Sequence, residues 1–150
     1  QLSVPFRWIT KVEISRVPVL GWITGMNKYI PVKRGDKESK AVMLEACRKS
    51  LNDNIPVFFF PEGTRTPDGL PGPFKDGAFI TALENEAPIL PIVIDGPFKA
   101  LPKKGFLIEP LQLFRIKVLD EIGISELRGK TPEAAAEYVR AIIVNEKLKF

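Results

Sequence analysis

The chain has 150 residues, 45% of them hydrophobic, and a formal net charge of +4. We expect a single domain over residues 1–150 with a core of its own. The chain contains no histidine, which removes the commonest general base and metal ligand, so no metal site is expected. No apolar run reaches the roughly 20 residues of a membrane-spanning helix. The single cysteine, Cys47, falls in a helical apolar pattern, which predicts a buried thiol.

The positive charge is concentrated near the start of the chain. Residues 1–40 contain eight lysines and arginines against three acidic residues. Phe6, Trp8 and Trp22 are interleaved with these basic residues. Such a mixture suits the interface of an anionic membrane or a nucleic acid, and an ordinary solvated face is the alternative.

The first elements are expected between residues 29 and 60. Residues 29–33 predict a short strand followed by a turn. Asp36 or Ser39 can cap the helix that follows, and the Asn-Asp-Asn sequence at 52–54 ends it. The apolar run at 56–60 does not alternate, which is typical of a strand covered on both faces in a parallel sheet.

Prolines and glycines exclude regular structure between this run and Asp76, which can cap a helix with Phe79, Ile80 and Leu83 on one side. Residues 89–94 predict another strand, in which Pro91 indicates a sheet edge or a bulge.

The last third of the chain predicts one strand and one helix. The strand is expected at residues 113–118. Thr131 and Pro132 form a typical helix start. The helix carries an apolar stripe that includes Ala135 and Val139, and we expect this stripe to pack on the sheet rather than lie on lipid.

Three strands separated by two helices predict an α/β fold with a mainly parallel central sheet flanked by helices. Ligands of such sheets bind outside the carboxyl ends of the strands. Arg34, Glu62 and Asp95 follow the ends of the three expected strands. We therefore expect Arg34 and the loop at Glu62 to meet at one edge of the sheet.

The loop sequence Phe-Pro-Glu-Gly-Thr-Arg at 60–65 concentrates polar chemistry after a strand. Gly63 lets a ligand approach the main chain, Thr64 can donate a hydrogen bond, and Arg65 can grip a phosphate with two parallel hydrogen bonds. These groups suit a phosphate ester. The alternative is a local salt bridge between Glu62 and Arg65 that ties down an exposed turn.

Residues 60–65 also resemble the most diagnostic motif of the 1-acylglycerol-3-phosphate acyltransferases, a family of glycerolipid acyltransferases. The resemblance extends over residues 6–102, roughly two-thirds of the chain. Its other matching segments follow in order: Phe6-Arg7-Trp8, Lys11-Val12-Glu13, Pro18 to Trp22, Arg34, Phe74-Lys75, Gly77-Ala78-Phe79 and Pro88 to Pro91.

The resemblance implies transfer of a fatty acyl group to lysophosphatidic acid, giving phosphatidic acid for phospholipid biosynthesis. The acyl donor would be acyl-CoA or an acyl carrier protein thioester, with no other cofactor. The expected surroundings are a membrane surface at its cytoplasmic face, with no nucleic acid partner. A related glycerol-3-phosphate or lysophospholipid acyltransferase, or a non-catalytic module that binds acidic phospholipid, remains the alternative.

The resemblance also assigns roles at matching positions. Arg34 would contact the substrate phosphate, and Gly63, Thr64 and Arg65 would position the glycerol phosphate group. Glu62 would support catalysis. Lys75 is open between an anion contact and a solvated loop residue.

One family motif has no counterpart in the chain. The family's catalytic histidine, followed after four residues by an aspartate, should lie shortly before Phe6, and the chain contains no histidine. A positioned base is needed to take the proton of the attacking hydroxyl. We expect a domain truncated just before Gln1, and inactive by itself. A degenerate, non-catalytic relative is the alternative.

Overall fold

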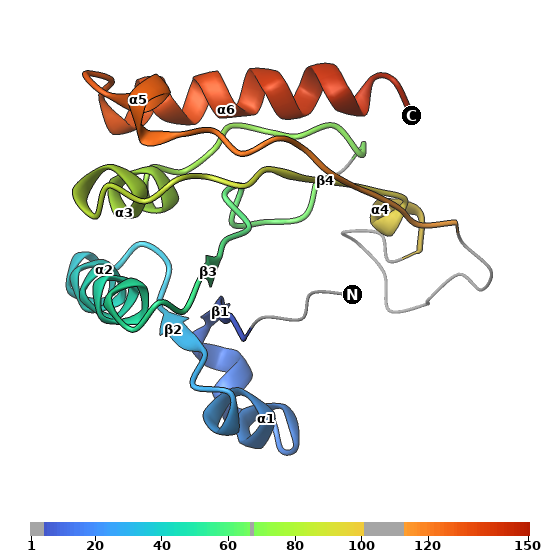
Figure 1. The fold of residues 1–150 in the computed structure, drawn as a ribbon. Coiled ribbons are helices and arrows are strands. Elements are labelled where there is room, and N and C mark those ends of the chain that lie inside the picture. The colour runs from blue at the N-terminus through green and yellow to red at the C-terminus, as the bar shows by residue number, and fades with distance from the viewer. Residues whose placement is uncertain (1–4, 67, 101–112) are drawn as a thin grey trace. The chain divides into compact units, whose positions relative to one another are not determined.

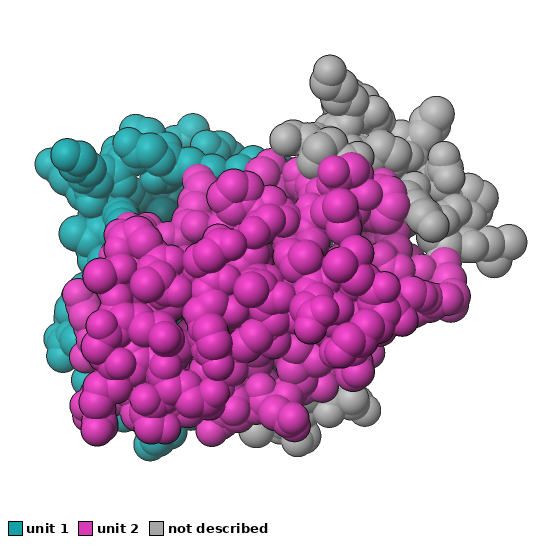
Figure 2. All heavy atoms as spheres, turned by 90° about the horizontal axis from the view of Figure 1, so that it is seen from above, with its two compact units in different colours: residues 1–60 teal, residues 61–150 magenta. Residues whose placement is uncertain are grey.

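The computed structural model describes residues 5–66, 68–100 and 113–150. The chain divides into two compact units, residues 1–60 (unit 1) and 61–150 (unit 2), which Figure 2 colours separately. The expectation of one domain over the whole chain stays a prediction. No helix among the described residues is long and apolar enough to cross a bilayer.

Unit 1 is a three-stranded parallel sheet with helices around it (Figure 1). Its elements in chain order are β1 (Arg7–Lys11), the 3-10 helix η1 (Val12–Arg16), α1 (Leu20–Met26), β2 (Ile30–Val32), α2 (Lys37–Asn52) and β3 (Val57–Phe58). The strand order is β2-β1-β3. Parallel strands joined through helices make an α/β fold, so the predicted fold class is confirmed.

The expected strands at 29–33 and 56–60 are present as β2 and β3, but they are not neighbours. Strand β1 lies between them and pairs in parallel with both. From its sequence, this segment is expected only to form a basic and aromatic surface. Because all three strands are parallel, the chain leaves β2 through Arg34 and β3 through Phe60 at the same edge of the unit 1 sheet.

Helix α2 covers one face of this sheet. Its residues Met43 and Cys47 form a buried cluster with Ile30 of β2. Cys47 is fully buried, as predicted. The partly buried side chains packed against the cluster include Val57 and Phe59.

The opposite face of the sheet is aromatic, because successive side chains of a strand point to opposite faces. Trp8 and Phe58 are register partners whose rings stack 4.8 Å apart. Phe60 approaches Trp8 at 5.3 Å and is 51% exposed. The expectation that residues 56–60 are covered on both faces is therefore wrong for Phe60.

Both residues expected to start α2 take part in its first turn. The Asp36 carboxylate accepts a hydrogen bond from Ser39 N at 2.9 Å, and the Ser39 hydroxyl accepts one from Lys33 N at 2.8 Å. The helix ends at Asn52, where the sequence predicts it. These two contacts fix the junction between β2 and α2.

Unit 2 consists of helices around a two-stranded antiparallel sheet. Its elements in chain order are α3 (Gly77–Glu84), β4 (Ile92–Asp95), α4 (Pro97–Ala100), β5 (Arg115–Val118), α5 (Ile124–Leu127) and α6 (Pro132–Lys147). The expected strands at 89–94 and 113–118 are present as β4 and β5.

The pairing of β4 differs from the expectation of a parallel crossover. In the described part of the chain β4 pairs with β5, antiparallel, from Ile92 opposite Val118 to Asp95 opposite Arg115. Strands consecutive in sequence commonly pair, and here that preference prevails over addition to the parallel sheet. The correction concerns the partner of β4, while the parallel sheet of unit 1 stands.

Pro91 marks an irregularity in this pairing, as predicted. Its carbonyl oxygen accepts a hydrogen bond from Leu119 N at 3.0 Å. An isolated bridge joins Ile89 to Ile122 beyond the regular ladder. Between the two paired regions, two residues of one strand face three of the other, which is the geometry of a β-bulge.

The core of unit 2 joins α3, α5 and α6. Phe79 is 2% exposed, and the buried residues packed with it are Ile122, Leu127, Ala135, Ala136 and Val139. Helix α6 contacts both α3 and β4, which lie beneath it in Figure 1. The apolar stripe of the last helix therefore packs inside the protein, as predicted. Thr131 caps that helix by accepting from Ala134 N at 3.2 Å.

Candidate phosphate-ester site

The loop at residues 61–75, called the motif loop below, is closed at its base. Pro61 O accepts a hydrogen bond from Lys75 N at 2.8 Å, so the two ends of the loop meet. Loops of this kind, with joined ends, are compact surface structures held by their own contacts. The predicted site residues Glu62 to Arg65 begin the motif loop.

Glu62 holds the motif loop from within. Its Oε2 accepts a hydrogen bond from Gly72 N at 2.8 Å, across a separation of ten residues. The residue is half-buried, and a charge-assisted bond to a backbone N–H is among the stronger hydrogen bonds. The hydrogen bond ties Glu62 to the far part of the loop, and the supporting part in catalysis expected for Glu62 stays a prediction.

Gly63 has a backbone conformation that disfavours side chains. Its φ is +63°, in the left-handed region. A Cβ placed there would lie 3.2 Å from Cε and 3.4 Å from Nζ of Lys75. The Lys75 side chain therefore extends along the Gly63 backbone, and its ammonium group lies beside the motif. Lys75 is exposed, and the choice between an anion contact and a solvated loop residue stays open for it.

Thr64 and Arg65 follow Gly63 and are both exposed. An exposed hydroxyl and an exposed guanidinium can donate hydrogen bonds, and the guanidinium brings positive charge. A phosphate ester carries the matching acceptors and charge. The roles of these residues remain predictions from the motif.

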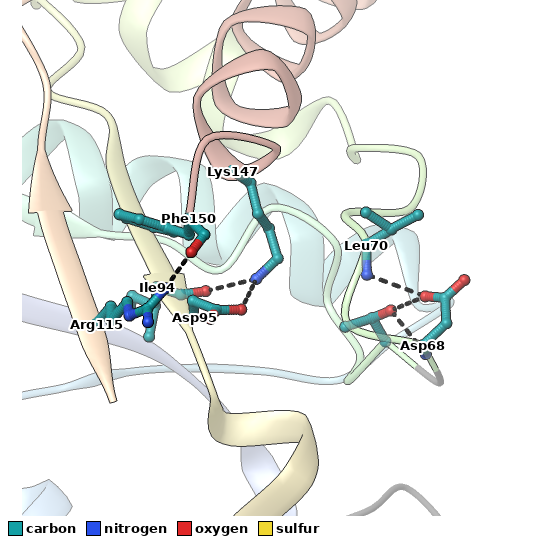
Figure 3. Close-up of polar contacts among 8 residues, drawn as sticks. Asp68, Leu70, Ile94, Asp95, Arg115, Lys147 and Phe150 are labelled. Atoms are coloured by element: carbon teal, nitrogen blue, oxygen red, sulfur yellow. Dashed lines mark hydrogen bonds and ion pairs between the residues drawn. The ribbon is translucent and has the colours of Figure 1, made fainter. Parts of the chain in front are cut away.

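Asp68 holds the far side of the motif loop. Its Oδ1 accepts from the Thr66 hydroxyl at 2.7 Å and from Leu70 N at 3.0 Å (Figure 3). The hydrogen bond from Thr66, followed by that from Leu70, lowers the pKa of Asp68 below its usual value. The Asp68 carboxylate therefore stabilises the conformation of the loop through these hydrogen bonds.

Arg140 of α6 also holds the motif loop, and the sequence analysis did not identify it. Its Nε donates to Gly72 O at 2.8 Å and its Nη2 to Pro71 O at 3.0 Å. Nothing in the local pattern of α6 marks this arginine, which lies on the polar side of an amphipathic helix. Its partners are distant in sequence, so only the fold reveals the contact.

Arg34 lies in unit 1, directly after β2, and is exposed. The nearby Asp36 carboxylate accepts a hydrogen bond from Ser39 N and lies 3.4 Å from Lys33 Nζ. The motif loop belongs to unit 2. The expected meeting of Arg34 with that loop stays a prediction.

Asp95 was expected to follow a strand, but it is the last residue of β4, and it has a structural partner. Lys147 Nζ lies 2.9 Å from Asp95 Oδ1 and 3.1 Å from Ile94 O, as Figure 3 shows. The Lys147 side chain is only 10% exposed. This pair ties the end of α6 to β4.

Among the described residues no cluster of three or more histidine, cysteine, aspartate or glutamate side chains could hold a metal ion.

Comparison with known proteins gives a consistent result. The chain is 41% identical over 101 residues to the chloroplastic 1-acyl-sn-glycerol-3-phosphate acyltransferase BAT2 of Brassica napus, a match that covers 67% of this chain and 29% of that protein. It is 30% identical over 135 residues to a 1-acyl-sn-glycerol-3-phosphate acyltransferase of Limnanthes alba, covering 89% of this chain and 47% of the relative. The chain thus spans less than half the length of these relatives.

The fold is shared with a solved structure. The crystal structure of the 1-acyl-sn-glycerophosphate (LPA) acyltransferase PlsC from Thermotoga maritima matches with a TM-score of 0.79 and 24% identity, over 97% of this chain and 57% of that one. A family model described as Acyltransferase matches residues 1–95, which include the parallel sheet and the whole motif loop. The chain therefore belongs to the Acyltransferase family.

Proposed function

We propose that this protein belongs to an enzyme that transfers a fatty acyl group from an acyl thioester to 1-acylglycerol 3-phosphate, forming phosphatidic acid. The motif loop carries the proposal. The Lys75 side chain lies against Gly63 there, and the cations of Lys75 and Arg65 belong to the same short loop. The names of the relatives, 1-acyl-sn-glycerol-3-phosphate acyltransferases, supply the acceptor.

The proposed reaction is a direct acyl transfer. The acceptor's hydroxyl oxygen attacks the thioester carbonyl carbon, the carbon–sulfur bond breaks, and the proton of the hydroxyl ends on the departing thiol. Arg65, Lys75 and Arg34 would hold the acceptor's phosphate. Glu62 would keep the motif loop in shape. The base that relays the proton is not a histidine of residues 1–150, since these contain none.

The donor in this proposal is acyl-CoA or an acyl carrier protein thioester. Either is consumed as a substrate, so the reaction requires no resident cofactor. Acyl transfer by direct attack also leaves no covalent acyl-enzyme. A trial of both donors with the same acceptor identifies the one used.

We further infer that unit 1 binds a membrane surface, where both acceptor and product reside. Exposed apolar side chains gather on α1 and the turn before it, and Trp22 is 72% and Met26 67% exposed. Arg16 and Lys28 flank this segment and are exposed. Apolar side chains beside basic ones suit a membrane with anionic lipid, as at the cytoplasmic face.

The phosphate part of the proposal is tested on Arg65. In the Arg65→Ala variant of residues 1–150 we expect binding of a short-chain lysophosphatidic acid to weaken by about 1.5 to 3 kcal/mol, the usual value of a hydrogen bond to a charged group. Arg65→Lys should recover only part of the loss, since lysine lacks the planar fork. Titration calorimetry measures both, and Arg34→Ala tests the second arginine in the same way.

Arg48→Ala is the control for these arginine variants. Arg48 is an exposed helix residue that bonds Glu45 in its own helix at 2.7 Å, so its loss should leave binding unchanged. A folded Arg65→Ala protein that binds the ligand as tightly as the native chain would remove Arg65 from the site. Binding of glycerol 3-phosphate in preference to lysophosphatidic acid would favour a related acyltransferase.

A further inference from the structure

The guanidinium of Arg140 spans two successive carbonyl groups of the motif loop. Its Nε donates to Gly72 O at 2.8 Å and its Nη2 to Pro71 O at 3.0 Å. Arginine has a planar fork of donors in fixed geometry, so it can hold two acceptors at once, which a lysine ammonium cannot match. The two carbonyls are thereby fixed in position and direction relative to α6.

A single peptide group connects Arg140 to Glu62. The carbonyl of Pro71 and the N–H of Gly72 belong to the same planar peptide. That carbonyl accepts from Arg140, and that N–H donates to Glu62 Oε2 at 2.8 Å. A cation therefore lies at one end of the peptide dipole and a carboxylate at the other. Each of the two hydrogen bonds polarises the peptide group, and this polarisation strengthens the other hydrogen bond.

Helix α6 gives Arg140 a rigid support. Val139, the preceding residue, is 3% exposed, and Ala136, four residues before Arg140, is 5% exposed; both belong to the core of unit 2. Glu137 Oε1 accepts from Arg140 Nη1 at 3.1 Å, which further orients the guanidinium. The core holds the helix in place, and the hydrogen bonds of Arg140 hold the motif loop against that helix.

We propose that Arg140 is a positioning residue for the motif loop, acting through the Pro71–Gly72 peptide and Glu62 on the Gly63 to Arg65 segment. The inference rests on the proposed function, because it assumes that this segment binds a phosphate ester. Glu62 is joined directly to Gly63. If the Glu62 carboxylate is no longer held by the Gly72 N–H, the backbone from Gly63 onward can turn away from the bound phosphate ester. The lost contact then appears as weaker phosphate-ester binding.

The test measures binding of a short-chain lysophosphatidic acid to residues 1–150 by calorimetry, together with hydrogen exchange of the Gly72 amide. For Arg140→Met we expect at least tenfold weaker binding and faster exchange of Gly72. Arg140→Lys should be intermediate in both, because its ammonium keeps the charge and N–H donors but lacks the planar fork. The matched control is Arg48→Met, since Arg48 also bonds a glutamate three residues before it, Glu45, but lies in unit 1.

A double-variant cycle separates positioning from a general effect on stability. If Arg140 acts through Glu62, then Arg140→Met should cost little further affinity in a Glu62→Ala protein, whereas independent effects would add. Additive losses would overturn the inference, and so would native affinity in folded Arg140→Met. If Arg140→Met does not fold, Arg140→Lys decides by the same criteria.

Failure of the inference is distinguishable from failure of the proposed function. A native chain that binds lysophosphatidic acid, with Arg140 variants that bind it equally well, overturns the positioning role and leaves the proposed acceptor intact. A native chain that binds no phosphate ester overturns both.

Discussion

Gly63 is the residue at which conformation and ligand binding should be most closely coupled. It adopts a φ of +63°, and the end of the Lys75 side chain lies only 3.2 to 3.4 Å from where a Cβ would project. A methyl group there meets a backbone penalty of roughly 1 to 2 kcal/mol and forces the lysine to move. Substitution should therefore affect both stability and the position of the ammonium.

For Gly63→Ala we predict a loss of about 1 to 2 kcal/mol in the free energy of unfolding and several-fold weaker binding of lysophosphatidic acid. Gly129→Ala is the matched control, because Gly129 has a φ of +80° with no atom within 4 Å of the added Cβ. It should lose similar stability and retain binding. Denaturant unfolding and calorimetry give the two quantities. Equal affinities in the two variants would show that the Lys75 contact does not matter to the site.

At this scale, sequence reasoning identifies residues whose chemistry is local. Glu62 to Arg65 are adjacent in the chain, so an acid, a glycine, a hydroxyl and a guanidinium are visible together. The partners of Glu62 and Arg140 are set by how the chain folds back. Arg140 contacts Pro71 across 69 residues, and no periodicity or motif encodes such a contact.

Among the elements, α2 has an N-terminal cap, Asp36, whose contribution to the stability of the fold should depend on pH. The hydrogen bond from Ser39 N, and then the contact with Lys33, lower the pKa of Asp36 below its usual value. The charged form is thus favoured in the folded protein. The charged carboxylate stabilises the fold fully at a pH above the pKa that Asp36 has in the unfolded chain. This stabilisation is lost as the pH falls through the lower pKa that Asp36 has in the folded protein.

We predict that Asp36→Asn reduces the acid sensitivity of unfolding between about pH 5 and about pH 2, because asparagine caps the helix without titrating. Urea unfolding followed by circular dichroism across this range measures the effect. Asp120→Asn, which removes an exposed carboxylate outside this helix, is the control. If both variants keep the native acid sensitivity, the Asp36 cap does not set it.

Elements with a clear period were predicted well, and short strands less so. Helices α2 and α6 begin at the capping residues seen in the sequence, because caps are local. Strand β1 was missed, since its side chains alternate between the α2 core and the aromatic face and leave no continuous apolar run. The partner of β4 was wrong, because pairing depends on segments elsewhere in the chain.

The molecule as a whole carries a positive charge of +4, and its unit 1 exposes apolar residues on α1. Together these features predict stronger binding to vesicles that contain anionic lipid than to neutral ones, and weaker binding as salt is added. Replacing Trp22 by alanine should weaken the binding about tenfold, in proportion to the apolar surface removed.

Sedimentation with the two kinds of vesicle tests this prediction. Leu148→Ala is the control, since Leu148 is 70% exposed but belongs to unit 2. Equal binding to both vesicles, unaffected by salt, would show that charge is not the attraction. An unchanged affinity of the Trp22→Ala variant for vesicles would show that Trp22 of α1 is not part of the membrane contact.

The most direct test of the proposed reaction is the formation of phosphatidic acid from a labelled acyl thioester and lysophosphatidic acid. Residues 1–150 should bind the acceptor but transfer acyl groups about 100- to 10,000-fold more slowly than the same chain preceded by a segment with the family's histidine motif. Changing that histidine to alanine should abolish the gain, with folding checked in all three proteins. Rapid transfer by residues 1–150 alone would contradict the account, as would an extended, folded chain that acylates no lysophosphatidic acid.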